Sequence, residues 1–163
     1  MHSRWQATGM SKGGGAERRG DGAAGRGETP AGGASSVLIV EDDADLRAVL
    51  VEALTMEGYA VQKAANGGDA LDIARMVPPG LIILDLMMPV MDGWEFREHQ
   101  KRDQRLRQVP VVAMSAALPY LGRHPIDVDG FICKPMELSA LLSLVRRFVG
   151  PPANAPATVL PPG

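Results

Sequence analysis

Four short apolar segments in the middle of the sequence are each followed at once by a side chain that could do chemistry. The segments "VLIV", "LIIL", "VVAM" and "FIC" are followed by Glu41 and Asp42, by Asp85, by Ser115 and by Lys134, respectively. Each residue alone has an ordinary explanation, because strand ends are exposed and an acid such as Glu41 or Asp42 can cap a helix. Together, three acids, a hydroxyl and an amine that end different buried segments indicate one shared site.

The types of these residues favour phosphoryl chemistry assisted by a divalent cation. Clustered carboxylates repel one another unless a cation lies among them. An all-oxygen set with few protein ligands is typical of Mg²⁺, and a lysine and a hydroxyl suit phosphate oxygens. Asp85 could itself be the nucleophile, because the formation of an aspartyl phosphate is established covalent chemistry.

Such a site needs a scaffold that brings the ends of distant segments together. Strands that are apolar on both faces and alternate with helices are typical of a parallel sheet covered on both sides. Ligands bind such sheets beyond the carboxyl ends of the strands. The patterns predict strands at 36–40, 59–65, 81–84, 109–114 and 130–133, and helices at 44–58, 66–76, 92–103 and 137–149.

The composition excludes several classes of protein. The apolar content of 45% and charged content of 22% are ordinary for a globular domain. A net charge of −2 argues against DNA or an anionic membrane as a partner, and no apolar run approaches the roughly 20 residues that cross a bilayer. The single cysteine, Cys133, allows no internal disulfide and indicates a reducing, cytoplasmic compartment. Because Cys133 lies in a predicted apolar strand, we expect its side chain to pack in the core.

The length and local composition predict one domain with two tails. Residues 1–34 hold ten of the nineteen glycines and almost no large aliphatic side chains, so we expect them to be disordered. Their five Arg/Lys against three Asp/Glu leave a nucleic-acid-binding arm as an alternative to an inert tail. Residues 151–163 contain five prolines and predict an extended, disordered tail. The folded domain is predicted at 35–150.

The stretch from 37 to 149 resembles the receiver (response regulatory) domain of bacterial two-component response regulators. The blocks "VLIVEDD", "LIILDLMMPVMDG", "VVAMSA" and "GFICKP" match that family in order and spacing. The resemblance implies an α/β, flavodoxin-like (βα)5 fold, with a doubly wound parallel five-stranded sheet in the order 2-1-3-4-5. No output domain follows in this sequence, so the stand-alone, single-domain type is expected.

The resemblance also implies a role for each acid. Asp85 would accept a phosphoryl group from a phosphohistidine on a sensor histidine kinase or a histidine phosphotransfer protein. Glu41, Asp42 and Asp85 would hold Mg²⁺, directly or through water, and the backbone carbonyl of Met87 would complete the protein ligands. The signal would then pass to a separate downstream protein that the sequence does not identify.

The remaining site residues are implied in the same way. Lys134 would pair with a phosphoryl oxygen, Ser115 would hydrogen-bond another, and Phe131 would be the aromatic switch that packs inward when Ser115 moves. Met87 and Ala117 would face the rim of the site, where neither can orient a hydrolytic water. We therefore expect slow self-dephosphorylation and no enzymatic activity beyond the chain's own phosphotransfer and dephosphorylation.

One segment departs from the family. Only 18 residues separate Ser115 from Lys134, and Pro119, Gly122 and Pro125 lie among them. Since proline removes a donor and clashes with the preceding helical turn, a shortened fourth helix of at most one or two turns is predicted. The family's common dimer face would be reshaped, which leaves homodimer formation open.

Two other functions are consistent with parts of this pattern. A haloacid dehalogenase-type phosphatase also uses a strand-end Asp and Mg²⁺, but it requires a second Asp two residues later, where this chain has Met87. A phosphorylation-independent adaptor that keeps the receiver fold for binding alone is the second alternative. The intact set of Asp42, Asp85, Ser115 and Lys134 weighs against it.

Overall fold

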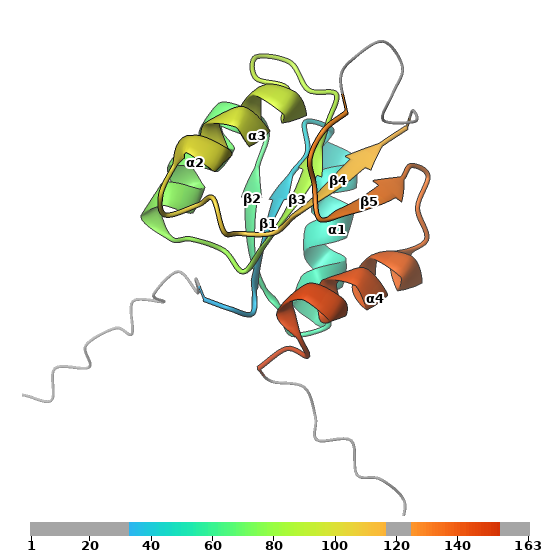
Figure 1. Cartoon of the computed structure of the whole chain (residues 1–163). Coiled ribbons are helices and arrows are strands. Elements are labelled where there is room, and N and C mark those ends of the chain that lie inside the picture. The colour runs from blue at the N-terminus through green and yellow to red at the C-terminus, as the bar shows by residue number, and fades with distance from the viewer. Residues whose placement is uncertain (1–32, 117–124, 154–163) are drawn as a thin grey trace, which may run out of the picture.

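The computed structural model describes residues 33–116 and 125–153 and contains one parallel sheet of five strands in the order β2-β1-β3-β4-β5 (Figure 1). The strands are β1 (Ser36–Val40), β2 (Ala60–Ala64), β3 (Leu81–Asp85), β4 (Val111–Ser115) and β5 (Gly130–Cys133). The helices in these residues are α1 (Ala44–Met56), α2 (Gly67–Met76), α3 (Gly93–Arg102) and α4 (Leu138–Val149). The predicted flavodoxin-like, doubly wound fold and its strand order are therefore confirmed.

Two layers of helices cover the sheet, which explains why its central strands are apolar on both faces. The core on one face joins β-strand side chains to Leu50 and Leu54 of α1 and to Leu141 and Val145 of α4. The core on the other face joins them to α2 and to Phe96 of α3. Figure 1 shows the same division, with α1 and α4 on one side of the sheet and α2 and α3 on the other.

The first three helices begin at side chains that cap them near the carboxyl ends of the strands. Asp43, Asn66 and Asp92 accept backbone N–H groups at the starts of α1, α2 and α3. Such caps satisfy donors that have no partner inside the helix. The suggestion that Glu41 or Asp42 caps the first helix is wrong, because Asp43 does so, and both acids are left for the site.

Helix α3 holds the chain on both sides of β4 through two buried polar residues. The Arg97 guanidinium donates to the Asp127 carbonyl at 2.7 Å and to Gln100 Oε1 at 2.6 Å. Gln100 in turn donates to the carbonyls of Leu106 and Val109, both at 2.9 Å. Residues 125–129 lead into β5 and are not helical, and Asp127 is held against α3 by these contacts.

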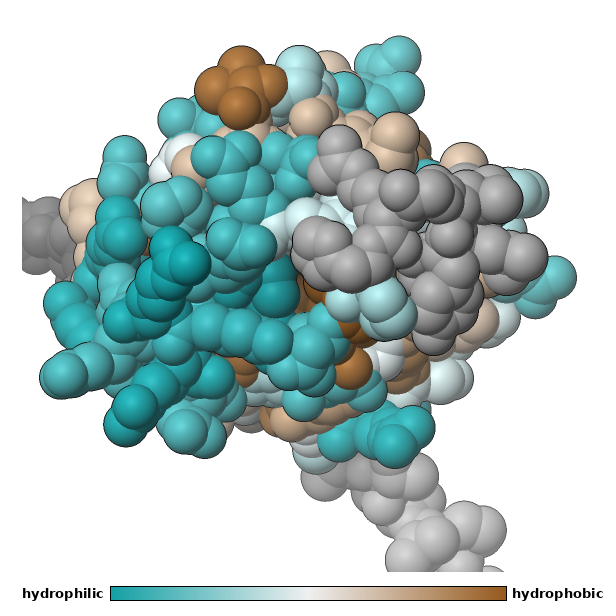
Figure 2. Space-filling view, turned by 45° about the horizontal axis from the view of Figure 1, so that its top comes forward, coloured by the Kyte–Doolittle hydropathy of each residue, from teal (hydrophilic) through white to brown (hydrophobic). Residues whose placement is uncertain are grey.

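Several predictions fall on residues outside the described part of the chain. The shortened fourth helix concerns mainly 117–124, and the two tails concern 1–32 and 154–163, so these remain predictions, as do the domain boundaries. None of the described helices has both the length and the apolar composition that crossing a membrane would require. With the upper end of the molecule turned forward, Figure 2 shows a mostly hydrophilic surface.

The prediction that Cys133 packs in the core is wrong, since its side chain is exposed. The strand β5 lies at the edge of the sheet, and Cys133 is its last residue, whereas the neighbouring Ile132 is buried. The apolar run "FIC" predicted a strand correctly but not which of its side chains would be covered.

Candidate functional site

The predicted acids meet at the carboxyl ends of two neighbouring strands. Because Val40 of β1 pairs with Leu84 of β3, the residues that follow each strand emerge side by side. Glu41 is 1% exposed and Asp85 4% exposed, whereas Asp42 is exposed to solvent. One carboxylate oxygen from each of the three lies within 4.8 Å of the others. This set of carboxylates could hold a metal ion.

Lys134 reaches the same point from the far edge of the sheet. Its Nζ lies 2.6 Å from Glu41 Oε2 and 3.3 Å from Asp85 Oδ2. Its backbone N–H donates to the Ser115 carbonyl at 2.9 Å, which fixes the start of the segment after β5 against the end of β4. The amine therefore bridges two of the three acids.

The electrostatics of the site follow from this arrangement. Burial raises the pKa of the Glu41 carboxyl, the Asp85 charge adds to this, and the hydrogen bond from Lys134 opposes it, so the pKa ends above its ordinary value. For Lys134, burial lowers the pKa, but the Glu41 hydrogen bond and the Asp85 charge outweigh burial and raise it. Lys134 is thus protonated, and its positive charge offsets the negative charge of the neighbouring carboxylates.

The loop that carries Glu41 and Asp42 is held by a residue that sequence reasoning missed. Arg47, in the first turn of α1, donates through Nη1 to the Glu41 carbonyl at 2.6 Å and to the Asp42 carbonyl at 3.3 Å. The Asp43 N–H also donates to Glu41 Oε1 at 3.1 Å. The sequence did contain a signal for this contact, because Arg47 lies one turn into the helix that begins just after Glu41 and Asp42.

The loop that follows Asp85 touches its carboxylate at once. The Met87 backbone N–H donates to Asp85 Oδ1 at 3.1 Å, while the Met87 side chain is exposed. Three residues later, Val90 has a φ of 72° and is 90% exposed. The loop ends where Gly93 donates to the Leu86 carbonyl at 3.1 Å. The start of this loop therefore contacts the Asp85 carboxylate, and its middle is exposed to solvent.

The two predicted switch residues occupy the strands beyond β3. Ser115 is buried at the end of β4, where it pairs in register with Cys133. Phe131 pairs with Ala113 and is half-buried against the core on the α2 and α3 face. The structure thus brings Glu41, Asp42, Asp85 and Lys134 into one cluster and places Ser115 and Phe131 on the strands beside it; their switch roles remain predictions.

Comparisons with known proteins agree with this geometry. Residues 37–146 match the response regulator receiver domain family. The polar-differentiation response regulator DivK of Brucella anthropi is 30% identical over 118 residues, covering 71% of this chain and 96% of DivK. The DNA-binding dual master transcriptional regulator RpaA of Synechocystis is 32% identical over 120 residues, covering 69% of this chain and 48% of RpaA. The chain thus spans about half the length of RpaA and of the ycf27 regulators that it also matches.

Solved structures of similar chains share the fold. The chemotaxis protein CheY4 of Vibrio cholerae superposes with a TM-score of 0.63 at 27% identity, over 70% of this chain and 98% of CheY4. The receiver domain of the sensor histidine kinase PA1611 of Pseudomonas aeruginosa, which carries a magnesium ion in its active-site cleft, gives 0.67 at 26% identity over 74% and 99%. With these matches and the clustered acids and lysine, the chain belongs to the response regulator receiver domain family of two-component systems.

Proposed function

We propose that Asp85 is the phosphoacceptor of a two-component phosphorelay and that a sensor histidine kinase or a histidine phosphotransfer protein is the donor. The observation that carries this is the setting of Asp85: a carboxylate at the tip of a buried strand, 3.3 Å from a protonated lysine and within 4.8 Å of two further acids. A rigid strand presents the oxygen, and the cation offsets the charge that arrives with phosphate.

The transfer requires little acid–base chemistry from the protein. A carboxylate oxygen of Asp85 forms a bond to phosphorus while the phosphorus–nitrogen bond of the phosphohistidine breaks and its electron pair returns to the imidazole. The products are an aspartyl phosphate and the free histidine. Positioning and charge stabilisation dominate such phosphoryl transfers. Lys134 would pair with one phosphoryl oxygen and Ser115 would donate to another.

The acids fit Mg²⁺ as the cofactor. Glu41, Asp42 and Asp85 offer only oxygens, and the Met87 segment lies against Asp85, so that its carbonyl is suited to complete the set. When bound, the ion would neutralise the charge shared by the carboxylates and the phosphoryl group. The magnesium ion in the PA1611 receiver domain supports this assignment by analogy.

The output would be a phosphorylation-dependent change of surface, with Ser115 and Phe131 as the switch, read by a separate downstream protein in the cytoplasm. Direct DNA binding and other enzymatic activity are not part of the proposal. Self-dephosphorylation is expected to be slow, since an exposed methionine at 87 offers no group that orients an attacking water. Ala117, the other rim residue of that expectation, lies outside the described residues.

The test is to incubate the chain with Mg²⁺ and acetyl phosphate and to measure its intact mass. We expect the gain of one phosphate, lost in Asp85→Asn and kept in the matched control Asp72→Asn, which changes an exposed acid of α2. A folded wild-type protein that gains no mass from acetyl phosphate or from a phosphorylated histidine donor would instead support the adaptor function. Decay of the phosphorylated form within seconds, with no partner present, would contradict slow self-dephosphorylation.

A further inference from the structure

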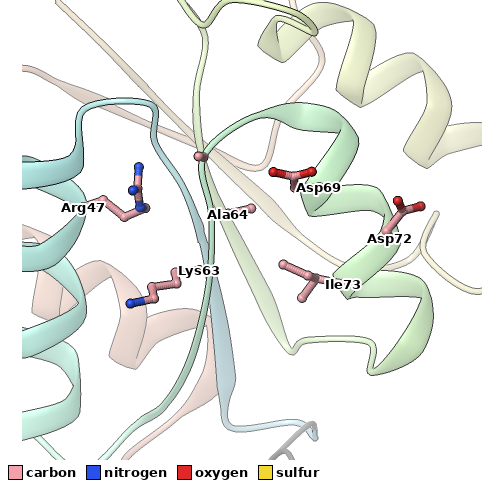
Figure 3. A pocket seen from close by; sticks show the side chains of 7 residues that line it. Arg47, Lys63, Ala64, Asp69, Asp72 and Ile73 are labelled. Carbon is pink, nitrogen blue, oxygen red and sulfur yellow. The ribbon is translucent and has the colours of Figure 1, made fainter.

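A cleft of about 420 Å³ lies at the open edge of the sheet, away from Asp85. Its floor is the edge strand β2, where Lys63 and Ala64 line it together with Ile73 of α2. Because α1 and α2 cover opposite faces of the sheet, they stand on either side of this edge (Figure 3). Side chains from both helices and from the strand therefore meet in one exposed groove.

The two sides of the cleft carry opposite charge. Arg47 and Lys63 lie on the side of α1, and Asp69 and Asp72 lie on α2, as Figure 3 shows. The Lys63 side chain forms no ion pair or hydrogen bond with any described residue. The acids and cations of the cleft are thus not used to neutralise each other.

The acids of α2 are also available to a partner. The Asp72 side chain is 81% exposed, and its nearest cation is Arg75 at 3.8 Å. Arg75 lies closer to Asp103, at 3.0 Å, so its charge is already engaged. Asp69 accepts a hydrogen bond from Asn66 but forms no ion pair within the described chain.

Each cation of the cleft lies at about the same position along the strand direction as one of its acids. Both α1 and α2 begin at the carboxyl edge of the sheet, so Arg47 and Asp69, each in a first turn, lie near that edge. Lys63 and Asp72 lie further from the carboxyl ends of the strands, on the two sides of β2. A twofold rotation about the strand direction leaves the position along the strand unchanged and exchanges the two faces of the sheet. Such a rotation would therefore place each cation of one copy opposite an acid of the other.

We propose that this edge binds a second copy of the chain through a twofold axis that runs along β2. That axis places the α1 side of one copy against the α2 side of the other, so that Arg47 faces Asp69 and Lys63 faces Asp72, twice over. A twofold axis perpendicular to the sheet would instead place α1 against α1 and bring like charges together. Self-complementary patches of this kind are what an isologous dimer requires.

The proposed dimer does not rest on the phosphoacceptor function, although Arg47 contributes to both, since its Nη1 also donates to the Glu41 carbonyl. The strands of both copies would point the same way, which leaves both Asp85 sites and both α4 helices accessible. Exposed ion pairs contribute little each and are screened by salt, so the association is weak and depends on ionic strength. Its strength comes from four matched contacts rather than from an apolar patch.

The experiment is sedimentation velocity on the full chain up to about 1 mM, the weak end of specific association. The variants are Lys63→Glu and Asp72→Lys, each alone, both in one chain, and as a mixture of the two single variants. Lys63→Gln and Asp72→Asn are included as neutral versions in case a charge reversal impairs folding. Thermal melting and phosphorylation by acetyl phosphate establish that each variant keeps its fold and its Asp85 site.

The wild type is expected to dimerise with concentration and to dissociate when salt is raised. Each charge reversal should lower the association constant by roughly tenfold or more, because it creates two like-charge contacts per dimer. The double variant should dimerise again, and the two single variants should pair with each other but not with themselves. A wild type that stays monomeric throughout, or a mixture that associates no better than its components, would overturn the proposal.

Discussion

The loop that leaves β1 and the loop that leaves β3 both carry acids of the candidate site, yet they are held in different ways. The first is short: Arg47 donates to two of its carbonyls, the Asp43 N–H donates to Glu41 Oε1, and the Asp43 side chain caps α1. The second runs from Leu86 to Asp92 and exposes the apolar side chains of Met87 and Val90. The half of the candidate site that carries Glu41 and Asp42 is thus fixed by contacts within the domain, whereas the half that carries Asp85 continues into a loop with exposed apolar side chains.

The largest effect is expected at the end of the second loop. A Cβ at position 93 would lie 2.8 Å from Leu86 Cα and 2.9 Å from the Asp85 carbonyl oxygen, and backbone atoms cannot move aside cheaply. We expect Gly93→Ala to lower the free energy of unfolding by about 2–3 kcal/mol and to slow phosphorylation of Asp85. Urea unfolding and the acetyl phosphate assay measure both.

Gly33→Ala is the control for that substitution, because nothing lies within 4 Å of the added methyl group. It should change the free energy of unfolding by no more than about 0.5 kcal/mol. If Gly93→Ala were equally mild, the close approach of α3 to the end of β3 would not be what sets the position of Asp85.

The next effect tests whether the first loop depends on its arginine. Arg47→Leu removes the donor to the Glu41 and Asp42 carbonyls, so we expect Mg²⁺ affinity to fall by about tenfold or more, as is typical when support for metal ligands is lost. Arg47→Lys keeps the charge but not the guanidinium geometry, so its Mg²⁺ affinity should lie between those of the wild type and Arg47→Leu. Calorimetric titration with Mg²⁺ measures the affinity.

Arg107→Leu is a matched control, since Arg107 is exposed and is separated along the sequence from the three acids of the candidate site. It should leave Mg²⁺ affinity unchanged. Equal losses in the two leucine variants would show that bulk charge, and not the carbonyl contacts, supports the ion-binding loop.

A smaller effect of opposite sign is expected at the exposed tip of the second loop. The left-handed conformation costs a β-branched residue about 1–2 kcal/mol, more than the entropy that glycine adds to the unfolded chain. Val90→Gly should therefore raise the free energy of unfolding by about 0.5–1 kcal/mol. Val49→Gly, at an exposed position inside α1, should lower it by about 0.5 kcal/mol. Urea midpoints that move in the same direction for both variants would contradict the assignment of strain to Val90.

The smallest effect concerns the cap of the first loop and is visible only in acid. Hydrogen bonds from the Leu46 and then the Asp45 N–H lower the pKa of Asp43 below its ordinary 3.8, with burial opposing them. A carboxylate with a lowered pKa stabilises the fold fully above the unfolded pKa, and this contribution is lost as pH falls through the folded pKa.

Asp43→Asn keeps a capping oxygen but does not titrate, so it isolates this contribution. The difference in melting temperature between the wild type and Asp43→Asn should be constant above about pH 4 and should shrink below it. A difference that stays constant into strong acid would show that the Asp43 charge contributes nothing beyond the cap.

Much of the fold and the central acids could be predicted from the sequence. Buried parallel strands are apolar on both faces, so an ionisable residue that ends such a run, as Asp85 and Lys134 do, stands out. The alternation of strands and helices then places those ends at one edge. The cluster of Glu41, Asp42, Asp85 and Lys134 follows from these local patterns alone.

What could not be predicted depends on contacts between distant segments or on the conformation of single residues. Arg47 and Arg97 act through long side chains whose acceptors include backbone carbonyls, and a carbonyl acceptor cannot be recognised from the residue type. The exposure of Cys133 is an exception, because the predicted strand order already placed β5 at the edge of the sheet and could have corrected the prediction of a buried side chain. The positive φ of Val90 runs against the preference of a β-branched residue, so the residue type gave no indication of it.

The attachment of residues 125–129 to α3 through Arg97 has a practical consequence for anyone who redesigns this protein. Contacts of Arg97 and Lys101 with Asp127 secure the path of the chain into β5, and with it the placement of the Lys134 amine. A redesign of the candidate site should therefore retain Arg97 and Gln100, because the placement of the Lys134 amine depends on contacts of α3 rather than on residues of the site itself.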